Sequence, residues 1–317
     1  MKKAKVLITG GAGYIGSVLT KYLLDRAFDV TVIDNLMYHQ TGLFGVCNYP
    51  NFNFIYGDAR DSNLLKEHVK NKDVIIPLAC IVGAPACDNN KQTAETTNVC
   101  TIKTLLSPTI ISKDQLIIYP TTNSGYGTQD SSNLLCTEST PLTPITLYGR
   151  LKAEAENYLL TYHSNSISLR LATVFGMSPR MRTDLLVNDF VLKALTDRSI
   201  VLFEKDFMRN YVYIGDIAAC MYYCIQHRDD MAHNIYNVGN DSLNMSKEDL
   251  ALQIKKYIPE LYIHEAATGR DPDKRNYIVS SKKLANAGFI ARTDLDTGIK
   301  ELIKGYSMIR KEHYGNA

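Results

Sequence analysis

Tyr148 and Lys152 are four residues apart at the start of a segment with helical periodicity that runs to about Tyr162. On a helix, residues at this spacing share one face and lie about a turn apart. The pKa of a free tyrosine is about 10, and a nearby ammonium group favours the phenolate. Tyr148 could therefore take a proton from an alcohol. The spacing alone is weak evidence, because a chain with 20 tyrosines and many lysines produces it by chance.

Hydroxyl and amide side chains precede this pair by some twenty residues. An apolar run over 115–119 is typical of a buried strand, and the sequence Pro120-Thr121-Thr122-Asn123-Ser124-Gly125-Tyr126-Gly127 follows it directly. In a parallel sheet, ligands bind beyond the carboxyl ends of the strands. We therefore take Thr122, Asn123 and Ser124 as candidate contacts to the reacting molecule.

Three glycines form a second candidate site near the start of the chain. Gly10, Gly13 and Gly16 follow an apolar run over 5–8 and have the spacing G-x-x-G-x-x-G. Such a turn lets backbone approach a dinucleotide's pyrophosphate, which then lies at a helix N-terminus. We expect Tyr14 and Ile15, between the last two glycines, to contact the cofactor too. The alternative is a glycine-rich turn that binds nothing.

The ends of the following strands support dinucleotide binding. Asp34 ends the apolar run 30–33, 18 residues beyond Gly16, where an acid accepts hydrogen bonds from the adenosine ribose and repels a 2'-phosphate. This position predicts NAD rather than NADP, with Asn35 beside it. Asp58 and Ala59 follow a strand over 52–56 and fit the adenine, although Asp58 is equally suited to capping a helix over 61–69.

Small residues follow the strand predicted over 73–77. Leu78 and Ala79 suit close passage of a cofactor, or simply tight packing. Strands alternate with helical segments, of which the clearest lie over 61–69, 96–106 and 148–162. This alternation predicts an α/β fold, a Rossmann-type doubly wound parallel sheet with helices on both faces. An oxidised nicotinamide beside Tyr148 would further favour its phenolate, and hydride would leave the carbon whose hydroxyl loses the proton.

Composition excludes several classes of protein. The 317 residues carry a net charge of +2 without a block of Lys or Arg, so we expect no nucleic-acid partner. We also expect no membrane span and no signal peptide, because the apolar runs are too short. Seven cysteines without a C-x-x-C pair favour reduced thiols in a cytoplasmic protein. Cys220 and Cys224 are four apart without a zinc-site partner, so we predict core packing and no metal.

Over nearly its whole length the chain resembles the extended short-chain dehydrogenases/reductases, in the NAD-dependent nucleotide-sugar epimerase/dehydratase family. The family's glycine turn and ribose acid match the residues above, and its Y-x-x-x-K motif matches Tyr148 and Lys152. Its catalytic hydroxyl matches Thr122, although Gly125 replaces the valine of the family's V-Y-G. The resemblance implies that Thr122 hydrogen-bonds the reacting sugar hydroxyl, that Tyr148 is the base, and that Lys152 holds the nicotinamide ribose and lowers the tyrosine pKa.

The resemblance also implies a substrate-binding half. It predicts an NAD-binding domain over 1–173 plus roughly 211–240, and a smaller α/β domain for the nucleotide sugar over 174–210 and 241–317. Asn188 either replaces a sugar-phosphate contact usual in the family or caps its helix. Arg209 and Arg270 match family arginines that often meet phosphate, and a guanidinium suits a diphosphate. Both could instead be solvated surface arginines.

The residues after Thr122 narrow the reaction. Ser124 stands where a 4,6-dehydratase of this family has Glu and a 3,5-epimerase has Cys, and a serine hydroxyl is a poor acid or base at neutral pH. Oxidation at C4, epimerisation at C4 and ketone reduction remain. Several segments most resemble GDP-heptose 4-dehydrogenases of bacterial capsule synthesis, which predicts oxidation of GDP-D-glycero-alpha-D-manno-heptose. The alternatives are a GDP- or UDP-hexose 4-epimerase and a non-catalytic NAD-binding regulatory module.

The family further implies a homodimer, with helices near 97–106 and 148–162 pairing into a four-helix bundle. The second helix has an apolar stripe compatible with such pairing. The stripe comprises Leu151, Ala155, Tyr158, Leu159 and Tyr162. The same stripe could belong to the core of one subunit.

Overall fold

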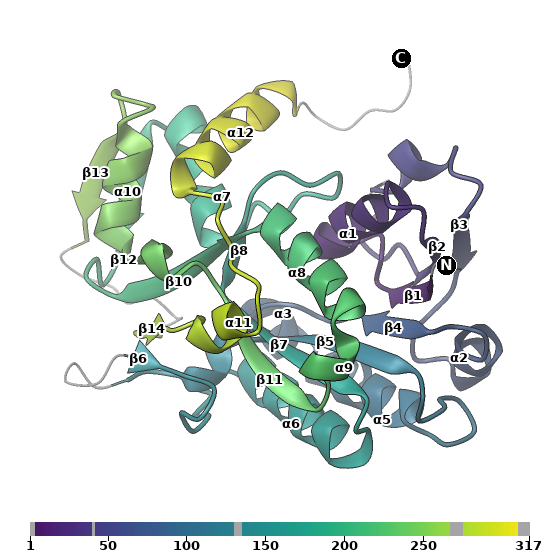
Figure 1. The fold of residues 1–317 in the computed structure, drawn as a ribbon. Coiled ribbons are helices and arrows are strands. Elements are labelled where there is room, and N and C mark those ends of the chain that lie inside the picture. Colours follow the sequence, from purple (N-terminus) through teal and green to yellow (C-terminus); the bar gives the residue numbers. More distant parts are fainter. Residues whose placement is uncertain (1–3, 40–41, 130–134, 267–274, 310–317) are drawn as a thin grey trace.

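A parallel seven-stranded sheet forms the centre of the computed structural model, which describes residues 4–39, 42–129, 135–266 and 275–309 (Figure 1). In sheet order its strands are β11 (Asn234–Val238), β7 (Ser166–Leu171), β5 (Leu116–Thr122), β4 (Val74–Pro77), β1 (Lys5–Thr9), β2 (Asp29–Asp34) and β3 (Phe52–Tyr56). The order reverses between β1 and β4. The Rossmann-type α/β fold predicted from the sequence is therefore confirmed.

Alternate residues of β1 bury opposite faces of the sheet. Val6 and Ile8 belong to a core cluster with α1 (Tyr14–Leu24) and α8 (Ile214–Gln226). Leu7 packs instead into the cluster with α2 (Ser62–Val69), α5 (Thr101–Leu105) and α6 (Leu147–Tyr162). Since both faces are covered, the central strands carry continuous apolar runs, which is why they were recognisable in the sequence.

One expected helix differs from the prediction, and one extended segment divides between two sheets. The helix expected over 96–106 is a π-helical turn η2 (Thr96–Cys100) followed by α5, with α4 (Lys91–Glu95) before it, and within the turn the Asn98 amide bonds both backbone groups of Ile81 at 2.8 and 2.9 Å. Residues 166–175 form two strands, β7 and β8 (Thr173–Phe175). They separate at Ala172, so that β7 stays in the large sheet while β8 pairs with β10 (Met208–Tyr213).

A second region packs around its own core at the upper left of Figure 1. Its apolar cluster draws on residues 175–211 and 243–306. The elements are β8, β9 (Ser199–Leu202), β10, β12 (Asn244–Ser246), β13 (Tyr262–Glu265), α7 (Leu186–Thr196), α10 (Lys247–Lys255) and α12 (Leu295–Met308). Shorter elements complete the described chain: α3 (Ala84–Asn89), α9 (Arg228–Met231), α11 (Lys282–Asn286), β6 (Leu135–Cys136), β14 (Ile278–Val279), η1 (Phe44–Val46), η3 (Asn123–Tyr126) and η4 (Asp241–Leu243). The predicted domain boundaries stay a prediction.

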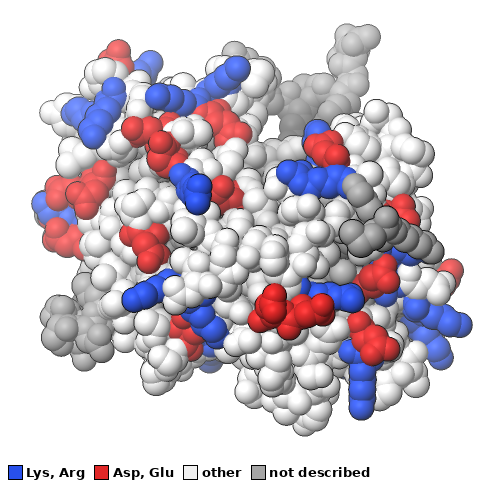
Figure 2. Space-filling model, viewed as in Figure 1, with Lys and Arg blue, Asp and Glu red and all other residues white. Residues whose placement is uncertain are grey.

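The described residues show mixed surface charges and helices without long apolar runs. On the face shown in Figure 2, acidic and basic side chains are interspersed. Within the described ranges, no helix is long and apolar enough to cross a membrane. Cys220 and Cys224 lie on α8 and are buried in the core, as expected. On α6, Leu151, Ala155 and Leu159 also belong to the core of the subunit, whereas Tyr162 is 67% exposed.

A buried ion pair fixes α6 against the sheet. Glu156 on α6 accepts hydrogen bonds from the Arg170 guanidinium of β7, the shortest at 2.7 Å, and from the Ser168 hydroxyl at 2.7 Å. The two charged side chains are 4% and 6% exposed. Losing one partner would leave the other charge buried and unpaired.

We therefore expect Arg170→Met to lower the free energy of unfolding by about 3–5 kcal/mol in urea denaturation. The matched control is Lys103→Met, which breaks an exposed pair between α5 and Glu154 of α6 and should lower the free energy of unfolding far less. Equal losses in the two variants would contradict the role given to the buried pair.

Candidate active site

The glycine turn brings β1, α1 and β4 into close contact. Gly10 has a φ of +73°, and a Cβ there would lie 2.5 Å from the backbone nitrogen of Ala79. A Cβ on Gly16 would lie 2.5 Å from the carbonyl oxygen of Gly10. Larger residues would collide with backbone at both positions. The turn leads into α1, whose N-cap Gly13 has no capping side chain, so first-turn amides can bind an anion.

A cavity of about 500 Å³ lies at this turn, across the carboxyl ends of β1 and β4. Its size is that of a small-molecule or cofactor site. Every residue that the sequence predicted to bind the cofactor lines it: Gly10, Gly13, Tyr14, Ile15, Gly16, Asp34, Asn35, Asp58, Ala59, Leu78, Ala79, Tyr148 and Lys152. The structure therefore brings these residues together, while their contacts with a cofactor stay a prediction.

Asp34 is held at the edge of this cavity by two backbone amides. One carboxylate oxygen accepts a hydrogen bond from Ala12 N at 2.9 Å and the other from Leu36 N at 2.8 Å. Both bonds fix the carboxylate at the end of β2. An acid in this place can accept hydrogen bonds from ribose hydroxyls and repels the 2'-phosphate of NADP.

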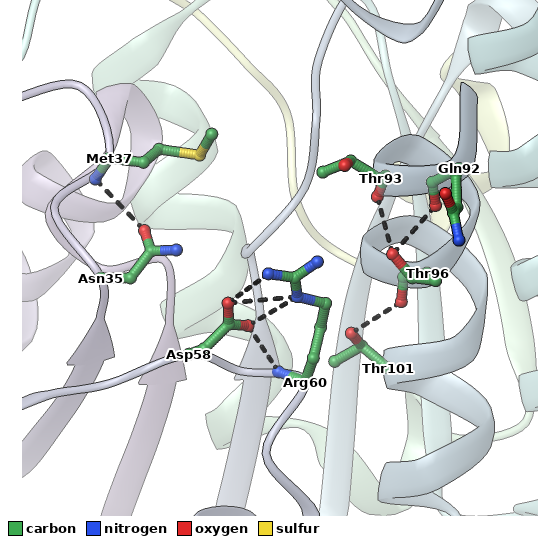
Figure 3. A network of polar contacts seen from close by, with 8 residues as sticks. All are labelled: Asn35, Met37, Asp58, Arg60, Gln92, Thr93, Thr96 and Thr101. Atoms are coloured by element: carbon green, nitrogen blue, oxygen red, sulfur yellow. Dashed lines mark hydrogen bonds and ion pairs between the residues drawn. The ribbon is translucent and has the colours of Figure 1, made fainter. Parts of the chain in front are cut away.

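Asp58 is engaged by a neighbouring arginine (Figure 3). The Arg60 guanidinium donates to both of its oxygens, at 2.6 to 3.1 Å, and this bonding holds the pKa of Asp58 below its usual value. Asp61, not Asp58, caps α2, accepting a hydrogen bond from Asn63 N at 2.9 Å. The capping alternative for Asp58 is therefore wrong. Asn35 lies near this pair in Figure 3, and its side chain accepts a hydrogen bond from Met37 N.

Tyr148 and Lys152 lie on the first two turns of α6, which begins at the N-cap Thr146. The Lys152 side chain is buried, with Nζ 3.9 Å from the centre of the Tyr119 ring on β5. Burial lowers the pKa of Lys152. Burial has the opposite effect on Tyr148, whose pKa it raises well above the ordinary value, and the positive charges of Arg182 and Arg275 oppose that rise. Without further positive charge, the phenol stays protonated at neutral pH.

The hydroxyl-rich end of β5 is already hydrogen-bonded within the protein. Thr122 donates to the Ser124 hydroxyl oxygen at 2.9 Å, and Arg275 donates to the same oxygen. Thr121 lines the cofactor cavity, whereas Thr122 does not. Asn123 is 1% exposed, and both polar atoms of its side chain lack a partner among the described residues. Its contact with a substrate stays a prediction.

Asn188 and Arg209, two of the substrate residues predicted in the second half, do not line the cavity. Asn188 is fully buried at the third position of α7, so it is not that helix's N-cap. Its side chain accepts from Gly176 N at 3.1 Å and donates to the Tyr14 hydroxyl at 3.0 Å. Arg209 is 3% exposed in β10 and donates to Met208 O at 3.0 Å. Arg270 lies outside the described residues. Contact of these residues with substrate remains untested.

Sequence reasoning missed several side chains at the site. Arg180, Arg182 and Cys80 line the cavity, and Arg275 reaches Ser124 from the second region. The sequence contained a signal for Arg180 and Arg182. Arg180 and Arg182 follow β8 by a few residues, and ligands of such folds bind beyond strand ends. Cys80 directly follows Leu78 and Ala79 and shares their signal, whereas Arg275 carries no comparable local pattern.

A sequence model of the "NAD dependent epimerase/dehydratase family" matches residues 6–239, which is most of the chain. The chain belongs to this family. The match covers the glycine turn, Asp34, Tyr148 and Lys152 together, and the family uses NAD. Within the described residues, no group of three His, Cys, Asp or Glu side chains could hold a metal ion.

Relatives within the family have different functions. The low-salt glycan biosynthesis protein Agl12 of Haloferax volcanii is 26% identical over 95% of this chain and 98% of its own. A putative UDP-glucose 4-epimerase of Methanocaldococcus jannaschii is 27% identical over 94% and 97%. The dTDP-glucose 4,6-dehydratase of Bacillus anthracis, solved with NAD, matches with a TM-score of 0.83 at 22% identity, over 96% of each chain. The last similarity confirms the fold alone.

The cavity's own residues fit NAD. Backbone amides and glycines lie where a diphosphate needs close approach, and Asp34 lies where a ribose needs an acceptor. When bound, NAD supplies the two-electron oxidant for an alcohol carbon. The residues to hold it are those lining the cavity, with Tyr148 and Lys152 at the end nearest β5.

A pH dependence of cofactor binding follows from the buried phenol. Ionised Tyr148 would attract the positive charge of oxidised NAD, so binding and ionisation favour each other. Because burial raises the pKa of the free phenol, the affinity for oxidised NAD should increase from neutral to alkaline pH, by up to about tenfold per pH unit above the pKa of the complex. The neutral ring of NADH should show no such gain.

Calorimetric titrations across that pH range would measure this effect. Tyr148→Phe should remove the pH dependence, while Tyr158→Phe on the same helix, outside the cavity, should keep it. An identical pH dependence in wild type and Tyr148→Phe would show that another group is responsible.

Proposed function

We propose that the protein oxidises the C4 hydroxyl of a nucleotide sugar with NAD, and that its substrate is GDP-D-glycero-alpha-D-manno-heptose. The observation that carries the reaction is the pairing of Tyr148 and Lys152 on one face of α6 beside the cofactor cavity, with no acid or thiol at position 124. Support for the heptose comes from the sequence resemblance of 185–190, 209–211 and 271–275 alone.

The proposed division of labour follows from the positions of the side chains. Tyr148 takes the proton of the C4 hydroxyl, Thr122 orients that hydroxyl, and Lys152 supplies positive charge that favours the phenolate. The Tyr119 ring lies against the Lys152 ammonium and limits where it can move. Arg182 and Arg275 add positive charge that lowers the pKa of Tyr148 against the effect of burial.

The surroundings of Ser124 argue against elimination. A 4,6-dehydratase needs a group that removes the C5 proton, and the Ser124 hydroxyl oxygen instead accepts hydrogen bonds from Thr122 and Arg275. Two donors on this oxygen make it a still weaker base. The chemistry that remains requires only Thr122, Tyr148 and Lys152.

A second candidate is a nucleotide-sugar 4-epimerase. The name of the Methanocaldococcus jannaschii relative favours it, and the same three residues would suffice. The two candidates differ in whether reduced cofactor accumulates. A non-catalytic NAD-binding module is less well supported, because such a protein needs no base beside the cavity.

The deciding experiment incubates the purified protein with excess NAD and GDP-, UDP-, CDP- and dTDP-sugars, GDP-heptose among them. Near-ultraviolet absorbance follows the reduced cofactor, and NMR follows the sugar. We expect a 4-keto heptose together with NADH, even if only one equivalent forms per subunit. A C4 epimer without net NADH would contradict the dehydrogenase and support the epimerase.

Tyr148→Phe should lower the turnover of whichever sugar reacts by about a hundred- to ten-thousand-fold, because it removes the base while keeping the ring. The matched control is Tyr162→Phe, which changes an exposed tyrosine at the end of the same helix. Steady-state rates would measure both. Unchanged turnover in Tyr148→Phe would refute the catalytic assignment.

We further propose that the protein forms a homodimer through α5 and α6. The exposed side of α6 carries Tyr158 and Tyr162, with ring centres 4.5 Å apart. Those rings could pack against a second copy. Light scattering of the purified protein would give the mass directly.

A further inference from the structure

One buried and one partly buried arginine line the cofactor cavity from outside the segments that carry the family's motifs. Arg180 and Arg182 lie between β8 and α7, and both line the cavity together with the glycine turn. Arg180 is 9% exposed, and the Arg182 side chain is 15% exposed. Burying two like charges close together costs free energy unless an anion compensates them.

Among the described residues, only one of the two arginines has a carboxylate within ion-pair distance. Arg182 makes a two-point ion pair with Asp184, with Nε 2.7 Å from one carboxylate oxygen. Arg180 has no ion pair among the described residues, and its buried Nε lacks a hydrogen-bond partner there. Its guanidinium carbon instead lies 4.3 Å from the centre of the Tyr38 ring, which also lines the cavity. An unpaired buried cation in a cavity indicates an anionic ligand.

The segment that carries the arginines is fastened to the helix at the glycine turn. The Ser178 hydroxyl donates to Tyr14 O at 2.7 Å and lies 2.9 Å from the Ser17 hydroxyl. The Tyr14 hydroxyl in turn donates to Gly176 O at 2.7 Å. These bonds hold the segment of the arginines close to the first turn of α1. Arg182 extends across to the loop after β4, with Nη2 4.0 Å from where a Cβ of Gly83 would lie.

We propose that Arg180 and Arg182 bind the diphosphate of NAD, adding side-chain donors from the second region to the backbone amides that the glycine turn provides. A guanidinium is suited to this contact because it donates two parallel hydrogen bonds to phosphate oxygens. The contact closes the cavity over the cofactor and slows its release between turnovers. This proposal concerns NAD alone and does not depend on which sugar reacts.

Arg180→Gln and Arg182→Gln test the proposal in cofactor binding without any sugar. Each should lower the affinity for NAD by roughly ten- to a hundredfold, the usual loss for a charge-assisted hydrogen bond, and should speed NAD dissociation by a similar factor. The affinity for ADP-ribose, which keeps the diphosphate and lacks nicotinamide, should fall by the same factor. Substitution by Lys at each position should lower the affinity less. The matched control, Arg198→Gln, changes an exposed arginine paired with Glu260 and should bind NAD like wild type.

Fluorescence titration and stopped-flow displacement would give the affinities and rates. Affinities within twofold of wild type in both variants would overturn the proposal. So would a loss confined to GDP or UDP with ADP-ribose unchanged, because the arginines would then serve the diphosphate of the substrate.

The wild-type protein gives a test that does not depend on the folding of variants. Adding ADP-ribose should protect the amides of residues 178–184 from hydrogen exchange, together with those of the glycine turn. Protection of the glycine turn with none over 178–184 would overturn the proposal.

Discussion

The close approach of two strand ends is the constraint on which the rest of this structure depends. Gly10 leaves β1 at the point where the strand order reverses, and its Cα passes the backbone of Ala79 with no space for a side chain. That contact opens a crevice between turns that lead away to opposite faces of the sheet. Asp34 ends β2 and Asp58 follows the end of β3, so both lie at this edge of the sheet, and Tyr148 lines the same cavity from the start of α6.

The part of the site that follows strand ends could be predicted from the sequence. Apolar runs marked the strands, and glycine spacing and the polar residues after each run marked the cavity, because both signals are local. The π-helical turn at Asn98 could not be predicted, since it depends on a bond to Ile81 in another segment. The separation of β7 from β8 at Ala172 depends in the same way on which strands are available to pair.

Residues in the second half were harder to assign. Asn188 was a candidate for the substrate or for a helix cap, yet its side chain joins Tyr14 to the turn at Gly176. Nothing in the neighbouring sequence indicates that partner, which is 174 residues away. Arg180 and Arg182 show the opposite case. Their place after a strand was a usable signal, but their orientation towards the glycine turn depends on bonds from Ser178 that only the structure reveals.

The hydrogen bonds through Asn188 have a consequence for folding during synthesis. Tyr14 bonds Asn188 on α7, and the Asn188 carbonyl accepts the Tyr306 hydroxyl of α12. The first helix and the last described helix thus share one buried anchor. When only the first 173 residues have left the ribosome, the glycine turn and Tyr148 are present. Arg180, Arg182 and the bonds through Asn188 and Tyr306 are still missing. The emerging chain can form six of the seven strands of its sheet early, yet it acquires a fully supported cofactor site only when synthesis is almost finished.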